Sequence, residues 1–394
     1  METGLTVSDS VGSVVYLDYN ATAPLRSEAT VAMVDALNTV GNASSQHAYG
    51  RAAASHVDIA RRRVAGLLGC SPGELVFTAG ATEANNLALY AASRGGRIVV
   101  GATEHPAVLE AARAHASEAL TLVPVTLVGA VDLAALSDAL CEGGVDVVSV
   151  MAANNETGVL SDLPRVIELA HAAGAVVHTD ATQLVGKLPV DLAELDVDLL
   201  SLSAHKFGGP QGVGALFVRR SLRLATRPLL HGGGHEKGWR AGTTNVAGIV
   251  GMGAAALAAD TGLNVEAPRV QALRDKLERS LLDSVPGSWR NGSPEHRLPG
   301  VTSITFPGAP ADAVLAAMPT VAASDGSACH SGALGPSHVL LAMGMSRLDA
   351  ESTIRFSLGH ATTDADIDHA IQAVPDAVLR VRAALGNASK RVPA

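Results

Sequence analysis

Aromatic residues and cysteines are scarce in this chain of 394 residues. Phe, Trp and Tyr make up 3% of the sequence, and the three cysteines cannot form a complete set of disulfide pairs. None of them lies in a Cys-x-x-Cys motif, and the first residues, METGLTVSDS, lack the basic region that begins a secretory signal. These absences predict a protein of the reducing cytoplasm whose core is built from aliphatic side chains.

Positive charge is also in short supply. Lys and Arg number 29 against 38 Asp and Glu, and a net charge of −9 gives no basic field that would attract nucleic acid. The longest uncharged apolar stretch, residues 246–259, contains glycines and is shorter than the roughly 20 residues of a membrane-spanning helix. Because 47% of the residues are hydrophobic, a disordered chain is excluded. We expect a soluble globular protein without direct nucleic-acid or membrane partners.

Short β-branched runs alternate with helical patterns between residues 74 and 220. Among the runs are RIVVG, VDVVSV, AVVHTD and VDLLSLS. This alternation predicts βα units, and therefore a largely parallel sheet with helices on both faces. Two further helical patterns, at residues 246–259 and 268–283, are separated by a change of composition at residues 260–267.

That change of composition is where we place the main domain boundary. The predicted organisation is a flexible N-terminal segment (1–15), a large domain (16–261) and a smaller C-terminal α/β domain (262–394).

Two predicted strand ends carry the residues with the clearest chemistry. Lys206 follows the run LLSLSAH among small residues and glycines, where burial would lower the pKa of its amine and make it a nucleophile. Asp180 ends the run AVVHTD, and open α/β sheets bind ligands at the carboxyl ends of their strands. A Schiff-base lysine and an aspartate facing a pyridinium nitrogen are recurring partners of pyridoxal phosphate. Taken alone, each residue has an alternative role: a surface lysine, and an aspartate that caps a helix.

A glycine turn, GATE at residues 80–83, stands between a predicted strand and a predicted helix. Its backbone N–H groups and the Thr82 hydroxyl are suited to binding a phosphate at the helix N-terminus. A plain turn with a threonine cap is the alternative.

Nine motifs together resemble the cysteine desulfurases of the class V aminotransferase family, the NifS/IscS-like enzymes. In order, they are YLDYNATAPL, FTAGATEANNLAL, TEHPAV, NNETG, HTDATQ, SLSAHKFGGPQGVGAL, RAGTTN, SDGSACHSG and IRFSLG. The match extends from about Tyr16 to about Leu385. The resemblance implies the fold of the type I enzymes that depend on pyridoxal 5′-phosphate. That fold has a large domain with a mostly parallel seven-stranded sheet and a smaller C-terminal α/β domain.

The resemblance also implies roles for residues that match the motifs. It implies that Lys206 holds the cofactor covalently, that Asp180 pairs with the ring nitrogen and that His105 stacks on the ring; capping of a helix is the alternative for His105. The other implied cofactor contacts are Ala81, Thr82, Asn155, Gln183, Ser203, His205 and Thr243. Thr243 would reach the phosphate from a second subunit, which implies a homodimer.

Two more residues are implied to act on the substrate. Arg355 would bind the substrate carboxylate together with Asn155, and an edge-strand arginine is the alternative. Cys329 would be the nucleophile, because it lies in a glycine-flanked loop of small residues of the kind in which a thiolate is accessible. Cys70 and Cys141 are expected to be packing residues, and no metal is implied.

The implied reaction converts L-cysteine to L-alanine and passes the sulfur, as a persulfide on Cys329, to an acceptor protein. A selenocysteine lyase, another class V aminotransferase or lyase, and a sulfur carrier with a vestigial cofactor site are alternatives. The stretch SACHSGALGPSHVL resembles the longer catalytic loop of the NifS/IscS group, whereas His330 and Gln211 depart from its pattern. The pathway stays open among iron–sulfur cluster assembly, thiolation of tRNA or cofactors, DNA phosphorothioation and biosynthesis.

Overall fold

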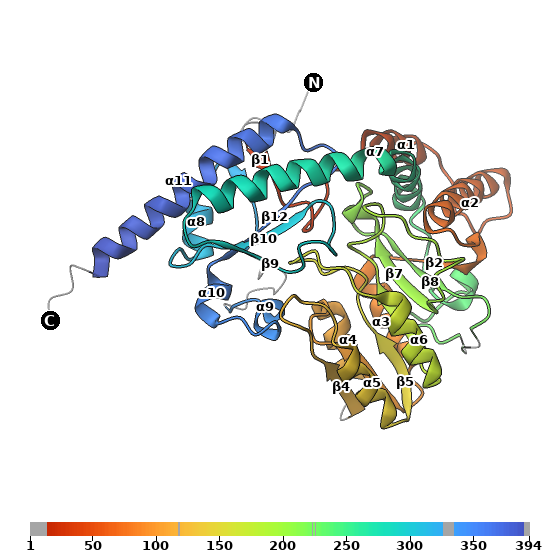
Figure 1. Ribbon diagram of the computed structural model, residues 1–394. Helices are drawn as coiled ribbons and strands as arrows, with labels where there is room; N and C mark the ends of the chain where they lie inside the picture. The colour runs from red at the N-terminus through yellow and green to blue at the C-terminus, as the bar shows by residue number, and fades with distance from the viewer. Residues whose placement is uncertain (1–13, 117–118, 223, 225, 326–334, 390–394) are drawn as a thin grey trace, which may run out of the picture.

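A computed structural model describes residues 14–116, 119–222, 224, 226–325 and 335–389. Its strands form a large sheet, a small sheet and one short strand pair, and helices pack around them (Figure 1). The strands are β1 (Val15–Tyr16), β2 (Leu75–Thr78), β3 (Arg97–Gly101), β4 (Leu120–Val123), β5 (Val145–Ser149), β6 (Val176–Asp180), β7 (Leu199–Ser203), β8 (Gly214–Val218), β9 (Trp289–Asn291), β10 (Val301–Thr305), β11 (Val321–Ala322) and β12 (Thr353–Ser357).

The large sheet has seven strands in the order β2-β8-β7-β6-β5-β3-β4. Its neighbours from β7 to β4 run parallel, whereas β8 is antiparallel to both β7 and β2. The mostly parallel seven-stranded sheet is therefore confirmed. The connection between β7 and β8 contains a single 3-10 turn, Ala204–Lys206, which sets the lysine at the carboxyl end of β7.

Both faces of this sheet are apolar, because alternate residues of its strands point to opposite sides. Val99, Val148 and Val177 lie side by side on β3, β5 and β6 and belong to one hydrophobic core. Ile98 and Val147, one position earlier, pair with each other and belong to the core on the other face.

Helices cover both faces. The helices are α1 (Ser27–Leu37), α2 (Ala48–Leu68), α3 (Ala81–Ala92), α4 (Pro106–Ala116), α5 (Leu133–Cys141), α6 (Leu163–Ala172), α7 (Val246–Ser284), α8 (Ala311–Ala317), α9 (His338–Ala342), α10 (Arg347–Glu351) and α11 (Asp364–Ser389). Helices α3 and α4 supply one core, and α2, α6 and the first half of α7 supply the other.

The small sheet is antiparallel, in the order β12-β10-β9. Ile304 and Phe356 from this sheet pack into a third core with the second half of α7 and with α11. The N-terminal strand β1 pairs with β11 and adds Val15 and Leu17 to the same core. The segment just after β1 is thereby held between the two sheets.

Helix α7 runs without interruption through the predicted boundary, from the large sheet to the small one (Figure 1). The two helical patterns expected at residues 246–259 and 268–283 are therefore one continuous helix that includes residues 260–267. Glu266 within that stretch forms an ion pair with Arg26 at 2.7 Å, and Pro268 removes only one helical N–H. Because the helix supplies residues to two separate cores, packing overrides the local change of composition. The division of the chain after residue 261 stays a prediction, and residues 1–13 lie outside the described part.

Within the described part of the chain, α7 is also the helix whose length and composition would allow a membrane span. In its most apolar window, 56% of the residues are buried inside the protein. That burial is typical of the core helix of a water-soluble protein.

The contact between α2 and α7 gives a test of this packing. A Cβ added at Gly253 of α7 would lie 2.5 Å from the Cα of Ala60, a backbone atom that cannot swing aside. We expect Gly253→Ala to destabilise the protein by about 1–2 kcal/mol despite the higher helix propensity of alanine. The measurement is the midpoint of thermal unfolding.

Gly66→Ala on α2 is the matched control, because a Cβ there meets no atom within 4 Å. It should be neutral or stabilising by up to about 1 kcal/mol. Equal midpoints for the two variants would contradict the close packing of α2 on α7.

Candidate active site

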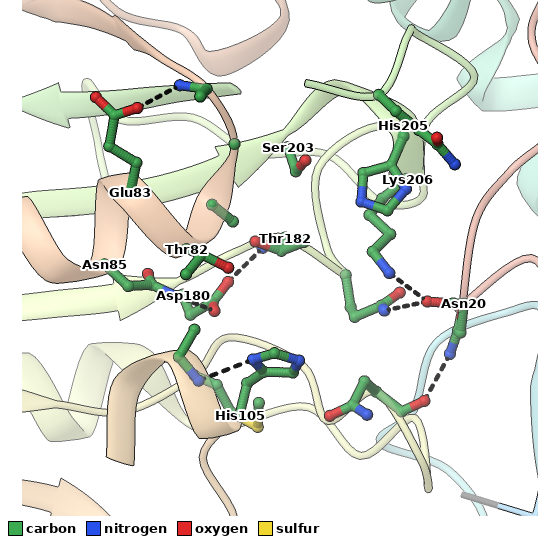
Figure 2. Close-up of a pocket in the computed structure, with 18 of the residues that line it drawn as sticks. Asn20, Thr82, Glu83, Asn85, His105, Asp180, Thr182, Ser203, His205 and Lys206 are labelled. Atoms are coloured by element: carbon green, nitrogen blue, oxygen red, sulfur yellow. Dashed lines mark hydrogen bonds between the residues drawn. The ribbon is translucent and has the colours of Figure 1, made fainter. Parts of the chain in front are cut away.

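A cavity of about 680 Å³ opens at the carboxyl ends of the parallel strands. Asp180 ends β6, Ser203 ends β7, and His105 and Met151 follow β3 and β5, so residues far apart in sequence meet there. Nine of the predicted residues line the cavity: Ala81, Thr82, His105, Asn155, Asp180, Gln183, Ser203, His205 and Lys206. Figure 2 shows Asp180, at one of these strand ends, beside Thr82 at the start of α3.

Asp180 is 5% exposed and is held at both carboxylate oxygens. Asn85 Nδ2 donates to Oδ2 at 2.7 Å, and the Thr182 backbone N–H donates to Oδ1 at 2.9 Å (Figure 2). A carboxylate has about four lone-pair sites, so these two bonds leave capacity for a further donor from the cavity.

The amine of Lys206 is fixed by two backbone carbonyls of the segment after β1. Its Nζ donates to the carbonyl oxygen of Asn20 at 2.6 Å and to that of Ala21 at 2.7 Å. The amine therefore lies in the cavity in a defined place and is not a surface lysine.

Helix α3 begins at this cavity. Its N-cap, Gly80, has φ 151° and ψ −179°, a conformation that L side chains rarely adopt, and a Cβ there would lie 3.9 Å from Ser203 Oγ. The first N–H groups of α3 and the Thr82 hydroxyl therefore lie beside the hydroxyl of Ser203. Together these donors form a binding site for an anion.

Two histidines flank the cavity. The His105 Nδ1 accepts the backbone N–H of Ala107 at 3.1 Å, so the helix-capping role is present. Burial, followed by the charges of Lys206 and Lys187, lowers the pKa of His205 to about 4. His205 is therefore neutral at neutral pH.

The structure places Arg355 and Thr243 outside the lining of this cavity. Arg355 is 2% exposed; its Nη1 donates to the Asn155 carbonyl at 3.1 Å and its Nη2 to Asp18 Oδ1 at 2.7 Å. Its Nε is buried and has no hydrogen-bond partner among the described residues. Thr243 is exposed to solvent. Their predicted roles stay predictions.

The cysteines separate into three cases. Cys329 lies outside the described residues. Cys70 packs against the core, and burial raises the pKa of its thiol to about 12, as expected for a packing residue. Cys141 is exposed at the end of α5, so its predicted packing role is wrong: Ala139 and Leu140 of the same turn are the residues that are buried, and Cys141 lies on the solvent side.

Three polar residues of the site were not singled out from the sequence: Asn20, Asn85 and Lys187. Asn20 and Asn85 belong to the motifs YLDYNATAPL and FTAGATEANNLAL, but nothing local indicates that they reach Lys206 and Asp180. Lys187 lies four residues after Gln183 in the sequence, and this spacing was the available indication that the two side chains could meet.

Comparison with known proteins defines the class. The family model described as Aminotransferase class-V matches residues 15–370, and the chain belongs to the class V aminotransferase family. The resemblance found in the sequence is thus confirmed, and with it an enzyme class that depends on pyridoxal 5′-phosphate.

Particular relatives narrow the class. The cysteine desulfurase IscS of Pasteurella multocida (strain Pm70) is 42% identical over 379 residues, covering 93% of each chain. The solved NifS-like protein from Rickettsia africae ESF-5 has a TM-score of 0.85 at 30% identity, over 92% of this chain and 99% of that one. SspA, solved in complex with cysteine, has a TM-score of 0.76 at 30% identity, over 87% of this chain and 98% of its own.

The residues present fit pyridoxal phosphate. Two buried atoms of cavity-lining residues, Asn85 Oδ1 and Thr182 Oγ1, have no hydrogen-bond partner among the described residues, as expected where a polar ligand belongs. The amine of Lys206 suits the aldehyde of the cofactor, and the Asp180 carboxylate, with its spare acceptor sites, suits the ring nitrogen. The anion-binding site at the start of α3 suits the phosphate.

Glu156, next to Asn155, gives a pH-dependent test of this site. It is buried, and the Ser337 hydroxyl donates to its Oε2. Burial raises the pKa of Glu156 to about 7, opposed by Ser337 and Arg355 and assisted by Asp325. Because the folded pKa lies above the usual value of 4.5, this group contributes stability that falls as the pH rises between 4.5 and about 7.

We expect Glu156→Gln, which cannot ionise, to keep that stability. Its free energy of unfolding should exceed that of the wild type by up to about 3 kcal/mol at pH 8 and by much less at pH 5. Thermal unfolding at both pH values measures this, with Glu142→Gln, an exposed glutamate on the surface, as the control. A difference that is the same at pH 5 and pH 8 would contradict the assignment.

Proposed function

We propose that this chain is a cysteine desulfurase that converts L-cysteine to L-alanine and passes the sulfur to an acceptor protein. The observation that carries the proposal is the meeting of the Lys206 amine, the Asp180 carboxylate and the start of α3 in one cavity. The 42% identity to IscS cysteine desulfurases over 93% of the chain supports the choice of substrate.

In this proposal the residues around the cavity hold pyridoxal 5′-phosphate. Lys206 would bond its aldehyde carbon, Asp180 would accept from its ring nitrogen, and His105 would stack on its ring. The phosphate would be bound by Ala81, Thr82, Ser203 and His205, while Gln183 would donate to the phenolic oxygen and Asn155 would lie beside the ring. When bound, the cofactor supplies an electron sink for the charge that develops on the α-carbon of the substrate.

The substrate is held by its carboxylate. Arg355 carries this role in the proposal, and the fixed fork of a guanidinium suits a carboxylate better than an ammonium does. Its bond to the Asn155 carbonyl ties the two substrate-binding residues together. Lys206 Nζ takes the proton from the α-carbon of the substrate and is the group that transfers it during the reaction.

Sulfur transfer is assigned to Cys329. Its thiolate attacks the sulfur atom of the substrate, a new S–S bond forms, and the C–S bond breaks with its electron pair left on carbon. Protonation of that carbon completes alanine, and the persulfide on Cys329 passes its outer sulfur to an acceptor thiol. Splitting the transfer into two steps through a covalent intermediate is ordinary nucleophilic catalysis.

A homodimer belongs to the same proposal. Thr243 is exposed in the single chain and would complete the phosphate site of a second subunit. Helix α1, which packs on α7, has three exposed apolar side chains, Val31, Val34 and Leu37. An apolar surface of this kind is typical of an interface between subunits.

The first prediction from this proposal concerns Cys329. Cys329→Ser should still bind the cofactor and cysteine but form no persulfide, because a neutral hydroxyl is a far poorer nucleophile than a thiolate. Mass spectrometry after incubation with cysteine should show one added sulfur on the wild-type Cys329 peptide.

Cys141, an exposed thiol, is the internal control for non-specific sulfur uptake. Continued turnover of cysteine by the serine variant would favour another class V aminotransferase or lyase, in which Cys329 is incidental. Retained activity on selenocysteine alone would favour a selenocysteine lyase.

The second prediction concerns assembly. The wild type should be a dimer by light scattering, and the double variant Val34→Asp, Leu37→Asp should be a monomer that loses the cofactor at least tenfold faster. Charges placed in an apolar interface would prevent association. Leu348→Asp, at a leucine 77% exposed on α10, is the control and should stay dimeric. A monomeric wild type with full activity would overturn the proposed dimer.

A further inference from the structure

Lys187 lies behind the wall of the active-site cavity and is partly buried. Its Nζ donates to Asn20 Oδ1 at 2.8 Å and to Gln183 Oε1 at 2.5 Å. It does not line the large cavity but borders, together with Lys206, a smaller cavity on the other side of these residues. None of the steps of the proposed reaction involves Lys187.

These two bonds fix the orientation of two side-chain amides. With its oxygen held by Lys187, Gln183 directs Nε2 to the backbone carbonyl of Asn20 at 3.0 Å. With Oδ1 held by the same amine, Asn20 directs Nδ2 to the carbonyl of Asn155 at 2.9 Å. A flip of either amide would set N–H groups against the N–H groups of Lys187.

The orientation is passed on to Lys206. The backbone oxygen of Asn20 accepts from Lys206 Nζ (Figure 2). The same oxygen also accepts from Gln183 Nε2. Asn20 therefore joins the two lysines, one at its side chain and the other at its backbone.

Lys187 acts through its N–H groups. Burial, followed by the charges of Lys206 and Arg355, lowers the pKa of Lys187 well below its usual value. An ammonium has three N–H bonds and a neutral amine has two, so either form can donate to both acceptors.

We propose that Lys187 is a positioning residue, whose hydrogen bonds to Gln183 and Asn20 set which end of each amide faces the cofactor site. The inference rests on the proposed function, in which Gln183 donates to the phenolic oxygen of the cofactor. Without Lys187 the amide of Gln183 keeps only its bond to the Asn20 carbonyl, and in the turned orientation its oxygen would repel that phenolic oxygen.

Two variants separate hydrogen bonding from packing. Lys187→Met keeps the length of the stem but has no N–H, whereas Lys187→Gln is shorter and keeps N–H donors. Both proteins are purified, freed of cofactor and titrated with pyridoxal 5′-phosphate, and the dissociation constant and the visible spectrum of the bound cofactor are recorded. Lys276→Met, an exchange of an exposed lysine, is the matched control and should behave as the wild type.

We expect Lys187→Met to bind the cofactor about tenfold more weakly than the wild type, with an altered visible spectrum. Lys187→Gln should lie between the two. A role in packing alone predicts the reverse order, because methionine fills the space better. That reverse order, or a wild-type affinity and spectrum for Lys187→Met, would overturn the proposal.

A double-mutant cycle tests whether Lys187 acts through Gln183, and it does not need the methionine variant to fold. Lys187→Gln should weaken cofactor binding at least threefold in the wild-type background and by a clearly smaller factor beside Gln183→Leu. Equal factors in both backgrounds would show that Lys187 acts independently of Gln183.

Failure of this inference is distinguishable from failure of the proposed function. The titrations contain no cysteine, so they stay readable if the wild type binds cofactor but makes no alanine. Lys187 variants that match the wild type, in an enzyme that does make alanine, would sink the inference alone.

Discussion

The carboxyl edge of the parallel sheet is the constraint on which the rest of the molecule depends. Because β6 and β7 run parallel side by side, Asp180 and Ser203 end at the same edge, and the turn after β7 brings Lys206 there. The two apolar faces of the sheet hold these strands in register through separate cores. The site is therefore as rigid as the sheet that carries it.

The other half of the site comes from the N-terminal part of the chain. Strand β1 pairs with β11 beside the small sheet, and Asn20 just after it reaches Lys206, Gln183 and Asn155. Its backbone N–H donates to Ser357 Oγ at the end of β12. One asparagine thus connects both sheets to the lysine, which explains how a site between two packing units is held in place.

Local patterns were sufficient to predict the parts of the site that lie at strand ends. The buried runs before Asp180 and Lys206 mark strands by composition alone, and the glycine turn before α3 marks a helix start. Lys187 and Asn20 act through partners more than 150 residues away or behind the cavity wall, which no local pattern encodes. The continuity of α7 was not evident from the sequence for the same reason, since two cores stabilise a helix whose composition changes midway.

The central claim is the chemistry performed at this edge of the sheet, and the products of the reaction test it most directly. Purified enzyme loaded with pyridoxal 5′-phosphate is incubated with L-cysteine and a thiol reductant, and alanine, sulfide, pyruvate and ammonia are quantified. A cysteine desulfurase releases alanine and sulfide in equal amounts with no pyruvate. Pyruvate and ammonia in place of alanine, or no turnover of cysteine by the loaded enzyme, would contradict the account.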